Sequence, residues 1–232
     1  SWSVSGTLPG STQTERWQTN QAVTGLATTA GTFEFIYYHQ YSVSVSYSVV
    51  GGGTPAAPSL QYSYFGGSKS AELTTSPQDL WVDRGPYSVT ATLGGSTQQE
   101  RWNAPTASGT VSVPGTIVVT YYHQYYLEVS GGEISSQWYN SGDIASVTVP
   151  RVFARSGGEG FRTTAYALDQ QLITVSPAAE DITLSILMDR PHTLVLGAVR
   201  QYEVALDQGA VRALNSITAP TIAGDEYWYD SG

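Results

Sequence analysis

The segment Tyr37-Tyr38-His39-Gln40-Tyr41 recurs as Tyr121-Tyr122-His123-Gln124-Tyr125, at an offset of 84 positions. Each copy lies in a run in which apolar or aromatic residues alternate with polar ones, from Phe33 to Tyr47 around the first copy. Alternation with period 2 is typical of a half-buried β-strand. The first run spans 15 positions, whereas an average strand has about 5–6 residues. We therefore expect the last strand of one domain to continue into the first strand of the next, without a flexible linker.

Two further signals repeat along the chain. Residues 3–17 match residues 88–102, and the matching segments end in Glu15-Arg16-Trp17 and Glu100-Arg101-Trp102. A weaker third copy of the joint segment is Val199-Arg200-Gln201-Tyr202. The pattern Trp-(Tyr/Val)-(Asn/Asp)-x-Gly occurs at 81–85, 138–142 and 228–232. There we expect a strand that ends in a turn, because Asp and Asn side chains bond nearby backbone N–H groups and glycine tolerates a positive φ.

These signals divide the chain after Gln40, Gln124 and Gln201. Residues 41–124 and 125–201 are then expected to form two β-sandwich domains. Residues 1–40 and 202–232 are each too short to bury a core comfortably. The end of the chain followed by its beginning restores the spacing found around Gly85. We therefore expect residues 202–232 to be the N-terminal half of a split domain, completed by residues 1–40 of the next copy as its C-terminal half.

The predicted contact residues fall into two groups. The junction between copies is expected to involve Ser1, Trp2, Val4, Leu8, Trp228, Tyr229, Asp230 and Gly232. The strand joints between domains are expected at Tyr37, His39, Gln40, Tyr41, Tyr121, His123, Gln124, Tyr125, Arg200, Gln201 and Tyr202. Two interpretations of this continuity stay open, a period of a longer tandem polypeptide and a separate subunit that assembles head to tail. The ordinary alternative is a truncated piece of a multidomain protein.

The rest of the sequence predicts an all-β fold of three small Ig-like or related sandwich domains, one of them split between the chain ends. Glycine pairs mark turns, no segment has helical periodicity, and Val, Ile, Thr and Tyr are frequent. In the second half of the chain, short strands are expected at Val147–Val149, Phe161–Leu168, Leu172–Val175, Ile182–Leu187 and Leu194–Val199. The segment Asp189-Arg190-Pro191-His192 is expected to form a tight turn before the last of them.

Composition excludes several classes of function. The 232 residues include 19 Asp and Glu but only 10 Lys and Arg, so the net charge is −9 and no basic stripe for nucleic acid is present. The absence of cysteine removes disulfides, thiol catalysis and Cys-ligated zinc. The sequence contains no apolar run of about 18 residues, so it predicts no membrane span.

The candidate chemical residues favour structural roles. His39 and His123 lie on the apolar face of their expected strands, without a cluster of acidic or histidine ligands. The repeated Glu-Arg-Trp segment favours a core tryptophan over a carbohydrate platform, because an active site seldom recurs in every domain. A calcium site at Asp83 or Asp230 lacks the dense acidic ligands it requires. We therefore expect no catalytic, cofactor-binding or metal-binding residue, and no enzyme activity. The single lysine, Lys69, allows an isopeptide crosslink at one place at most, and we expect none.

The quoted joint segments, Trp-Tyr-Asn/Asp-Ser-Gly and the segment from Met188 to Thr193 together resemble the tandem β-domains of archaeal cell-surface and secreted proteins, such as those that follow thermopsin-like proteases. A more distant likeness, mainly over residues 125–201, is to bacterial InlB-type B repeats. The resemblance covers essentially the whole chain, and it implies an extracellular stalk or spacer without catalytic residues.

The sequence therefore predicts a structural subunit, or one repeat period, of an extracellular archaeal filament. Its expected partners are copies of itself, joined head to tail by β-strand or split-domain complementation. The alternative is an adhesin or carbohydrate-binding surface stalk whose exposed aromatic side chains contact glycans.

Overall fold

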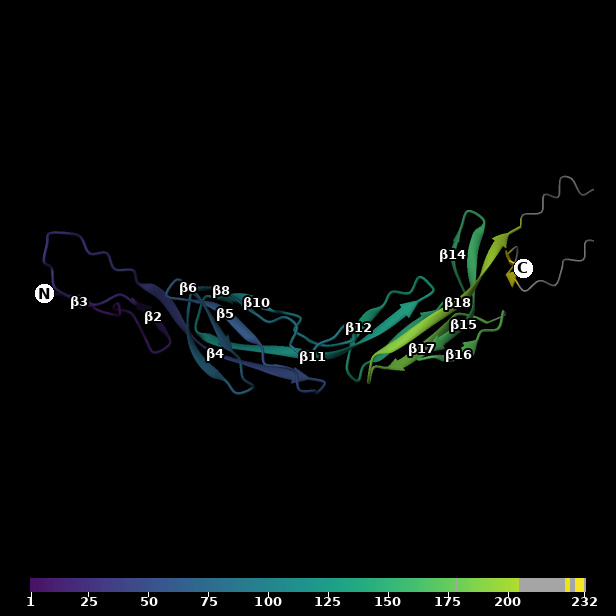
Figure 1. The fold of residues 1–232 in the computed structure, drawn as a ribbon, viewed down its shortest axis with the longest axis horizontal. Coiled ribbons are helices and arrows are strands. Elements are labelled where there is room, and N and C mark those ends of the chain that lie inside the picture. Colours follow the sequence, from purple (N-terminus) through teal and green to yellow (C-terminus); the bar gives the residue numbers. More distant parts are fainter. Residues whose placement is uncertain (178, 205–223, 226–227, 232) are drawn as a thin grey trace, which may run out of the picture. The chain divides into compact units, whose positions relative to one another are not determined.

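The computed structural model describes residues 1–177, 179–204, 224–225 and 228–231, and in these residues it contains strands and no helix (Figure 1). The all-β prediction is therefore confirmed for the described part of the chain. The chain divides into two compact units. The first contains Ser1–Thr97 and Arg101–His123, and the second contains Gln98–Glu100 and Gln124–Gly232.

The first unit begins with short strands and continues with longer ones. Its strands are β1 (Trp2–Ser3), β2 (Glu15–Gln18), β3 (Thr24–Gly25), β4 (Tyr38–Val50), β5 (Ser59–Tyr64), β6 (Gly67–Glu72), β7 (Gln78–Asp83), β8 (Gly85–Val89), β9 (Glu100–Asn103) without its first residue, β10 (Ser108–Val111) and the first half of β11 (Gly115–Ser130). β10, β8, β5 and β6 form one antiparallel sheet in that order. A second layer contains β7, β4 and β11, in which β4 and β11 run parallel.

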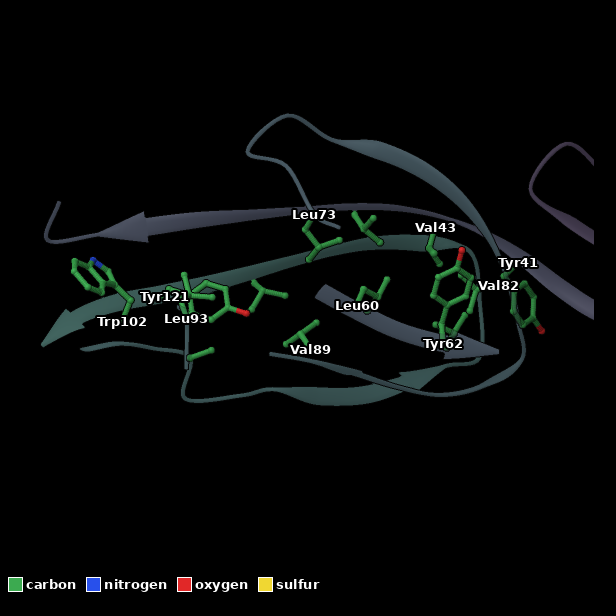
Figure 2. Close-up of a cluster of buried hydrophobic side chains, with 14 residues drawn as sticks. Tyr41, Val43, Leu60, Tyr62, Leu73, Val82, Val89, Leu93, Trp102 and Tyr121 are labelled. Carbon is green, nitrogen blue, oxygen red and sulfur yellow. The ribbon is translucent and has the colours of Figure 1, made fainter. Parts of the chain in front are cut away.

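The core of the first unit lies between these layers. Its buried side chains come from both, with Leu60 and Val89 on one layer and Val43 and Tyr121 on the other. Figure 2 shows the cluster extending from Tyr41 at one end to Trp102 at the other. Alternation along β5 and the first half of β11 places every second side chain in this core, as the period-2 pattern requires.

The second unit has a similar layered arrangement. Its strands are the second half of β11, β12 (Gln137–Asn140), β13 (Ile144–Val149), β14 (Val152–Ser156), β15 (Glu159–Leu168), β16 (Gln171–Thr174), β17 (Ile182–Leu187), β18 (His192–Glu203), β19 (Gly224–Asp225) and β20 (Trp228–Asp230). β13 and β17 pair with each other, and Ala145 and Ile186 share a core with Leu127, Tyr166 and Leu194 of the larger sheet. The five short strands expected here are confirmed, with ends shifted by up to four residues.

One expected strand is shorter than the alternation indicates. β4 begins at Tyr38, so Phe33 to Tyr37 lie outside it, and the expectation of one strand from Phe33 to Tyr47 is wrong. The equivalent residues near the second copy do form a strand, because Ile117–Tyr121 pair in parallel with Val45–Val49. For Phe33–Tyr37 no such partner strand is present among the described residues. A pattern of alternation cannot form a stable strand without a neighbour to accept its backbone hydrogen bonds.

Candidate functional site: three strand joints

The three Trp-x-(Asp/Asn) segments pair with the three long strands in one register. On β4, Gln40 lies opposite Asp83; on β11, Gln124 lies opposite Asn140; on β18, Gln201 lies opposite Asp230. The tryptophan of each segment precedes the Asp or Asn by two residues, and it lies opposite the residue two positions after the glutamine. The predicted joint residues Tyr41, Tyr125 and Tyr202 lie between, opposite Val82, Tyr139 and Tyr229 respectively. The structure therefore repeats one local arrangement at three places, in strands of 13, 16 and 12 residues.

The first joint is built around the fully buried side chain of Gln40. Its amide nitrogen donates to Asp83 Oδ1 at 2.8 Å, and its amide oxygen accepts from Arg16 Nε at 2.9 Å. The Arg16 guanidinium in turn lies 3.9 Å from the centre of the Trp81 ring. Each of these polar groups thus has a hydrogen-bond partner. A buried polar group without a partner would lower the stability of the fold.

Asp83 extends this network to a turn distant in sequence. Its carboxylate accepts from the backbone N–H groups of Phe65 at 3.1 Å and Gly66 at 2.7 Å, in the turn between β5 and β6. Both turn residues have positive φ, 52° and 73°, as a two-residue hairpin turn requires. The expectation that this Asp bonds its own nearby turn is corrected, because the pairing of β7 with β4 turns the carboxylate toward the neighbouring hairpin.

The third joint uses the same kinds of groups from different strands. Gln201 is fully buried, donates to Asp230 Oδ1 at 2.9 Å and accepts from Arg155 at 2.9 Å. Arg155 lies 4.4 Å from the centre of the Trp228 ring. Arg162 also pairs with the Asp230 carboxylate through two nitrogens, and its hydrogen bonds hold the pKa of Asp230 below its ordinary value.

Gly160 explains how Arg155 takes the place of Arg16. Arg16 lies opposite Gln40, whereas Gly160 lies opposite Gln201. A Cβ on Gly160 would lie 2.6 Å from Arg155 Cγ and 3.2 Å from the Trp228 ring. The missing side chain therefore leaves the space through which Arg155, on β14, reaches the buried amide.

The middle joint replaces the carboxylate with an amide. Gln124 donates from its amide nitrogen to Asn140 Oδ1 at 3.0 Å. Arg101 is at the position that matches Arg16 in the sequence repeat, and burial lowers its pKa. Burial, together with the nearby charges of Glu100 and Asp189, raises the pKa of Tyr125. The hydrogen-bonded Gln is thus common to all three joints, while the charge of its partner varies.

The opposite face of these strands carries stacked rings. His39 stacks on Trp17 at 4.3 Å, and His123 stacks on Trp102 at 4.4 Å, each ring pair nearly parallel. His39 Nε2 lies 2.6 Å from Glu15 Oε1, and His123 Nδ1 lies 2.9 Å from the Gly51 carbonyl. At the third joint, the Arg200 guanidinium lies 5.9 Å from the Phe161 ring, in the equivalent pairing.

The other predicted residues lie in different surroundings, some in aromatic contacts, some in the core and some at the surface. Trp2 contacts Phe33 and Phe35 through its ring, and the Tyr37 hydroxyl donates to the Ser5 carbonyl. Tyr121 is fully buried in the first core. Ser1 and Leu8 are exposed and Val4 is half-buried. Gly232 lies outside the described residues.

Sequence reasoning missed the arginines of the third joint and a buried histidine. Arg155, Arg162 and Gly160 belong to no repeat, so only the fold brings them to Gln201. His192, expected in a turn, is the first residue of β18. Its ring nitrogens face Asp169 Oδ2 at 2.7 Å and the Leu187 carbonyl at 3.0 Å.

Asp169 lies in the β15–β16 turn and holds the start of β18 to it. Burial of Asp169 tends to raise its pKa. Hydrogen bonds from the Thr193 N–H, His192 and Arg190 outweigh this effect, so the pKa of Asp169 lies below its ordinary value. Of these residues, His192 is buried and Asp169 is exposed, so the contact lies at the surface of the second unit.

The joints offer hydrogen bonding and stacking rather than open ligand positions. The carboxylates of Asp83 and Asp230 both accept from several N–H groups. Within the described ranges, no group of three or more Asp, Glu, His or Cys side chains is placed to hold a metal ion. Within the same residues, no helix is long and apolar enough to cross a membrane.

No protein-family model matches the chain, and no curated protein matches it.

Proposed function

We propose that this chain is a structural subunit, or one repeat period, of an extracellular filament or surface fibre, assembled head to tail. The observation that carries the proposal is the threefold repetition of one joint in one register: Gln40 with Asp83, Gln124 with Asn140 and Gln201 with Asp230. A repeated joint is what a linear array of similar domains needs, because each joint has to orient the next domain in the same way.

Each joint specifies its register through polar groups. A slip of one residue would turn Gln40 or Gln201 away from its Asp and leave buried hydrogen-bonding groups without partners. Buried polar contacts of this kind add specificity even where their net contribution to stability is small. The Arg–Trp contacts at the first and third joints cover the same amides with a planar guanidinium.

The long strands support a mechanical role. β11 has 16 residues and passes through its joint without a loop. Tension along such a strand acts on backbone hydrogen bonds and side chains on both sides of the joint, with no linker to extend first. The extracellular and archaeal parts of the proposal rest on the resemblance of the repeats. A cysteine-free composition is compatible with them.

Electron microscopy of the purified chain tests the proposal. We expect unbranched fibres whose abundance rises with protein concentration, and a mass distribution of whole-number multiples of 24.8 kDa. A chain that stays monomeric at every concentration, under conditions in which its far-UV spectrum shows a folded β-protein, would overturn the proposal.

A matched pair of variants makes this test more specific. Asp230→Ala removes the acceptor of the third joint, and we expect fewer and shorter fibres. Asp79→Ala removes an exposed carboxylate from β7 and should leave fibre formation unchanged. Equal effects of both substitutions would show that net charge, rather than the joint, controls assembly.

A further inference from the structure

We infer that the N-terminal residues 1–37 and the C-terminal end of β18 carry the two halves of one core, and that a second copy of this chain completes each half. The inference rests on the proposed function and specifies its interface. Four observations support it, each a comparison with the complete domain of residues 41–124.

The N-terminal segment already has the backbone arrangement of the second half of that domain. Trp2 pairs with Gly25 in the register in which Tyr87 pairs with Gly109. A Cβ on Gly25 would lie 2.5 Å from the Trp2 ring, and a Cβ on Gly109 would lie 2.6 Å from the Tyr87 hydroxyl. Each glycine thus lies under the aromatic ring of its partner. Residues 2–25 therefore share this strand pairing with residues 87–109 as well as the sequence repeat.

Core positions of this segment are exposed where their equivalents are buried. Leu8 has 36% of its surface accessible, whereas Leu93, its equivalent in the repeat, has 2%. Phe33 is also exposed, whereas its equivalent Ile117 is half-buried. Trp17 is half-buried, while Trp102 is buried. In the complete domain, Leu93 packs in a core that includes side chains of β4 and β5, which are strands of the first half of that domain.

The last residues of β18, together with Val204, which follows the strand, are also more exposed than their equivalents in the complete domain. Tyr202 and Val204 have 40% and 42% of their surfaces accessible, whereas Tyr41 and Val43, their equivalents after the joint glutamine, have 6% and 2%. In the complete domain these residues belong to the same cluster as Leu93 and Tyr121. The chain thus presents the first half of a core at β18 and the second half at residues 1–37.

Strand pairing leads to the same partner. In the complete domain, Gly115 pairs in parallel with Val43, and the repeat makes Gly31 and Val204 the corresponding residues. A second copy supplies the strand and the apolar side chains that the described residues do not provide at these two places. Because the two surfaces differ, the contact is head to tail and generates an open chain rather than a closed dimer.

Cysteine crosslinking tests this interface directly, because the natural chain has no cysteine. In the double variant Gly31→Cys/Val204→Cys, the inferred pairing places the two thiols of neighbouring copies on adjacent parallel strands, within the range of a disulfide. Mild oxidation should give a ladder of multimers on non-reducing SDS gels, which collapses to a single band on reduction. Each single variant can give dimers at most.

The double variant Gly31→Cys/Leu172→Cys is the matched control, since Leu172 is exposed on β16. Its multimers should form at least about tenfold more slowly, because docking does not raise the effective concentration of that thiol pair. Equal rates in the two double variants, or an internal disulfide within one chain, would overturn the inference.

Fibre formation by the natural chain distinguishes a failure of this interface from a failure of the proposed function. If the natural chain forms fibres but Gly31→Cys/Val204→Cys gives no ladder, this interface alone is rejected. If the natural chain forms no fibres and the double variant gives no ladder, the proposed function is rejected as well.

Discussion

The buried amide of Gln40 donates a 2.8 Å hydrogen bond to Asp83, and the buried amide of Gln201 makes the same bond to Asp230 at 2.9 Å. The surrounding groups are also alike, since each amide oxygen accepts from an arginine that lies over a tryptophan ring. The arginines come from β2 in one case and β14 in the other. The first and third joints therefore share the arginine–glutamine contact, although a different strand supplies the arginine at each.

Gln40→Met tests the value of the buried amide. The substitution keeps the length of the side chain but leaves Arg16 and Asp83 without one hydrogen-bond partner each. We expect the free energy of unfolding to fall by about 2 kcal/mol, the range for buried polar groups that lose a partner. Gln61→Met, at an exposed position on β5, should change it by no more than about 0.5 kcal/mol. Urea unfolding followed by tryptophan fluorescence measures both, and similar losses in the two variants would contradict the prediction.

Asp230→Asn tests the ion pair with Arg162. In the folded chain the pKa of Asp230 is lowered from 3.8, so ionisation of this carboxyl stabilises the fold above that pH and its contribution is lost as the pH falls through the lowered value. At pH 7 we expect the variant to be less stable by about 3 kcal/mol, since Arg162 loses its charged partner in a buried site. The difference should narrow in acid, as unfolding titrations at pH 7 and below pH 3.8 will measure. If the difference in free energy of unfolding did not change with pH, it would come from the geometry of the contact rather than from its charge.

Gly160→Ala tests the space used by Arg155. The added methyl group would lie 2.6 Å from Arg155 Cγ, so the side chain has to leave Gln201. We expect a loss of about 1–3 kcal/mol, typical of overpacking. Gly197→Ala on the neighbouring β18 is the control, because the nearest atoms there lie 3.7 Å away. The midpoint of thermal unfolding should therefore be lower for Gly160→Ala than for Gly197→Ala. Equal midpoints would show that the space beside Arg155 does not matter for stability.

Tyr121→Phe tests a buried hydroxyl in the first core. Burial, reinforced by Tyr47, raises the pKa of Tyr121 to about 12, and its hydroxyl donates to the Thr90 carbonyl at 2.5 Å. Because the folded pKa exceeds the unfolded value of 10.0, the resulting stabilisation is complete below pH 10 and is lost as the pH rises toward 12. We expect the variant to lose about 1 kcal/mol at pH 7, measured by urea unfolding.

Ultraviolet titration gives a second measurement of the same hydroxyl. Between about pH 9 and 11 the folded natural chain and the variant should show the same change in tyrosine absorbance, because Tyr121 stays protonated in this range. A smaller change in the variant would mean that Tyr121 ionises with the exposed tyrosines.

Much of the joint could be predicted from the sequence, because it is local. The alternation around His123 and Tyr125 predicts a strand that continues through the joint, and β11 has that form. The repeated Glu-Arg-Trp segment also places Trp17 and His39 on one face. By contrast, the alternation from Phe33 to Tyr37 predicts a strand that the described chain does not form. Side-chain pattern determines which face a strand would bury, but a strand also needs a neighbouring backbone.

The all-β class and the aromatic and apolar faces of the strands were predictable from the amino-acid sequence, as were the three places at which the Gln and Trp-x-(Asp/Asn) segments recur. These features follow from period-2 alternation and from repeats within the chain. Which side chains meet at each joint depends on how the strands are arranged in the folded chain. Arg155 reaches Gln201 across Gly160, and Asp83 binds the turn at Phe65 and Gly66, since residues far apart in sequence become neighbours only when strands align in a sheet. The exposure of Leu8, Tyr202 and Val204 is likewise a tertiary property, because burial depends on what packs against a side chain and not on its identity.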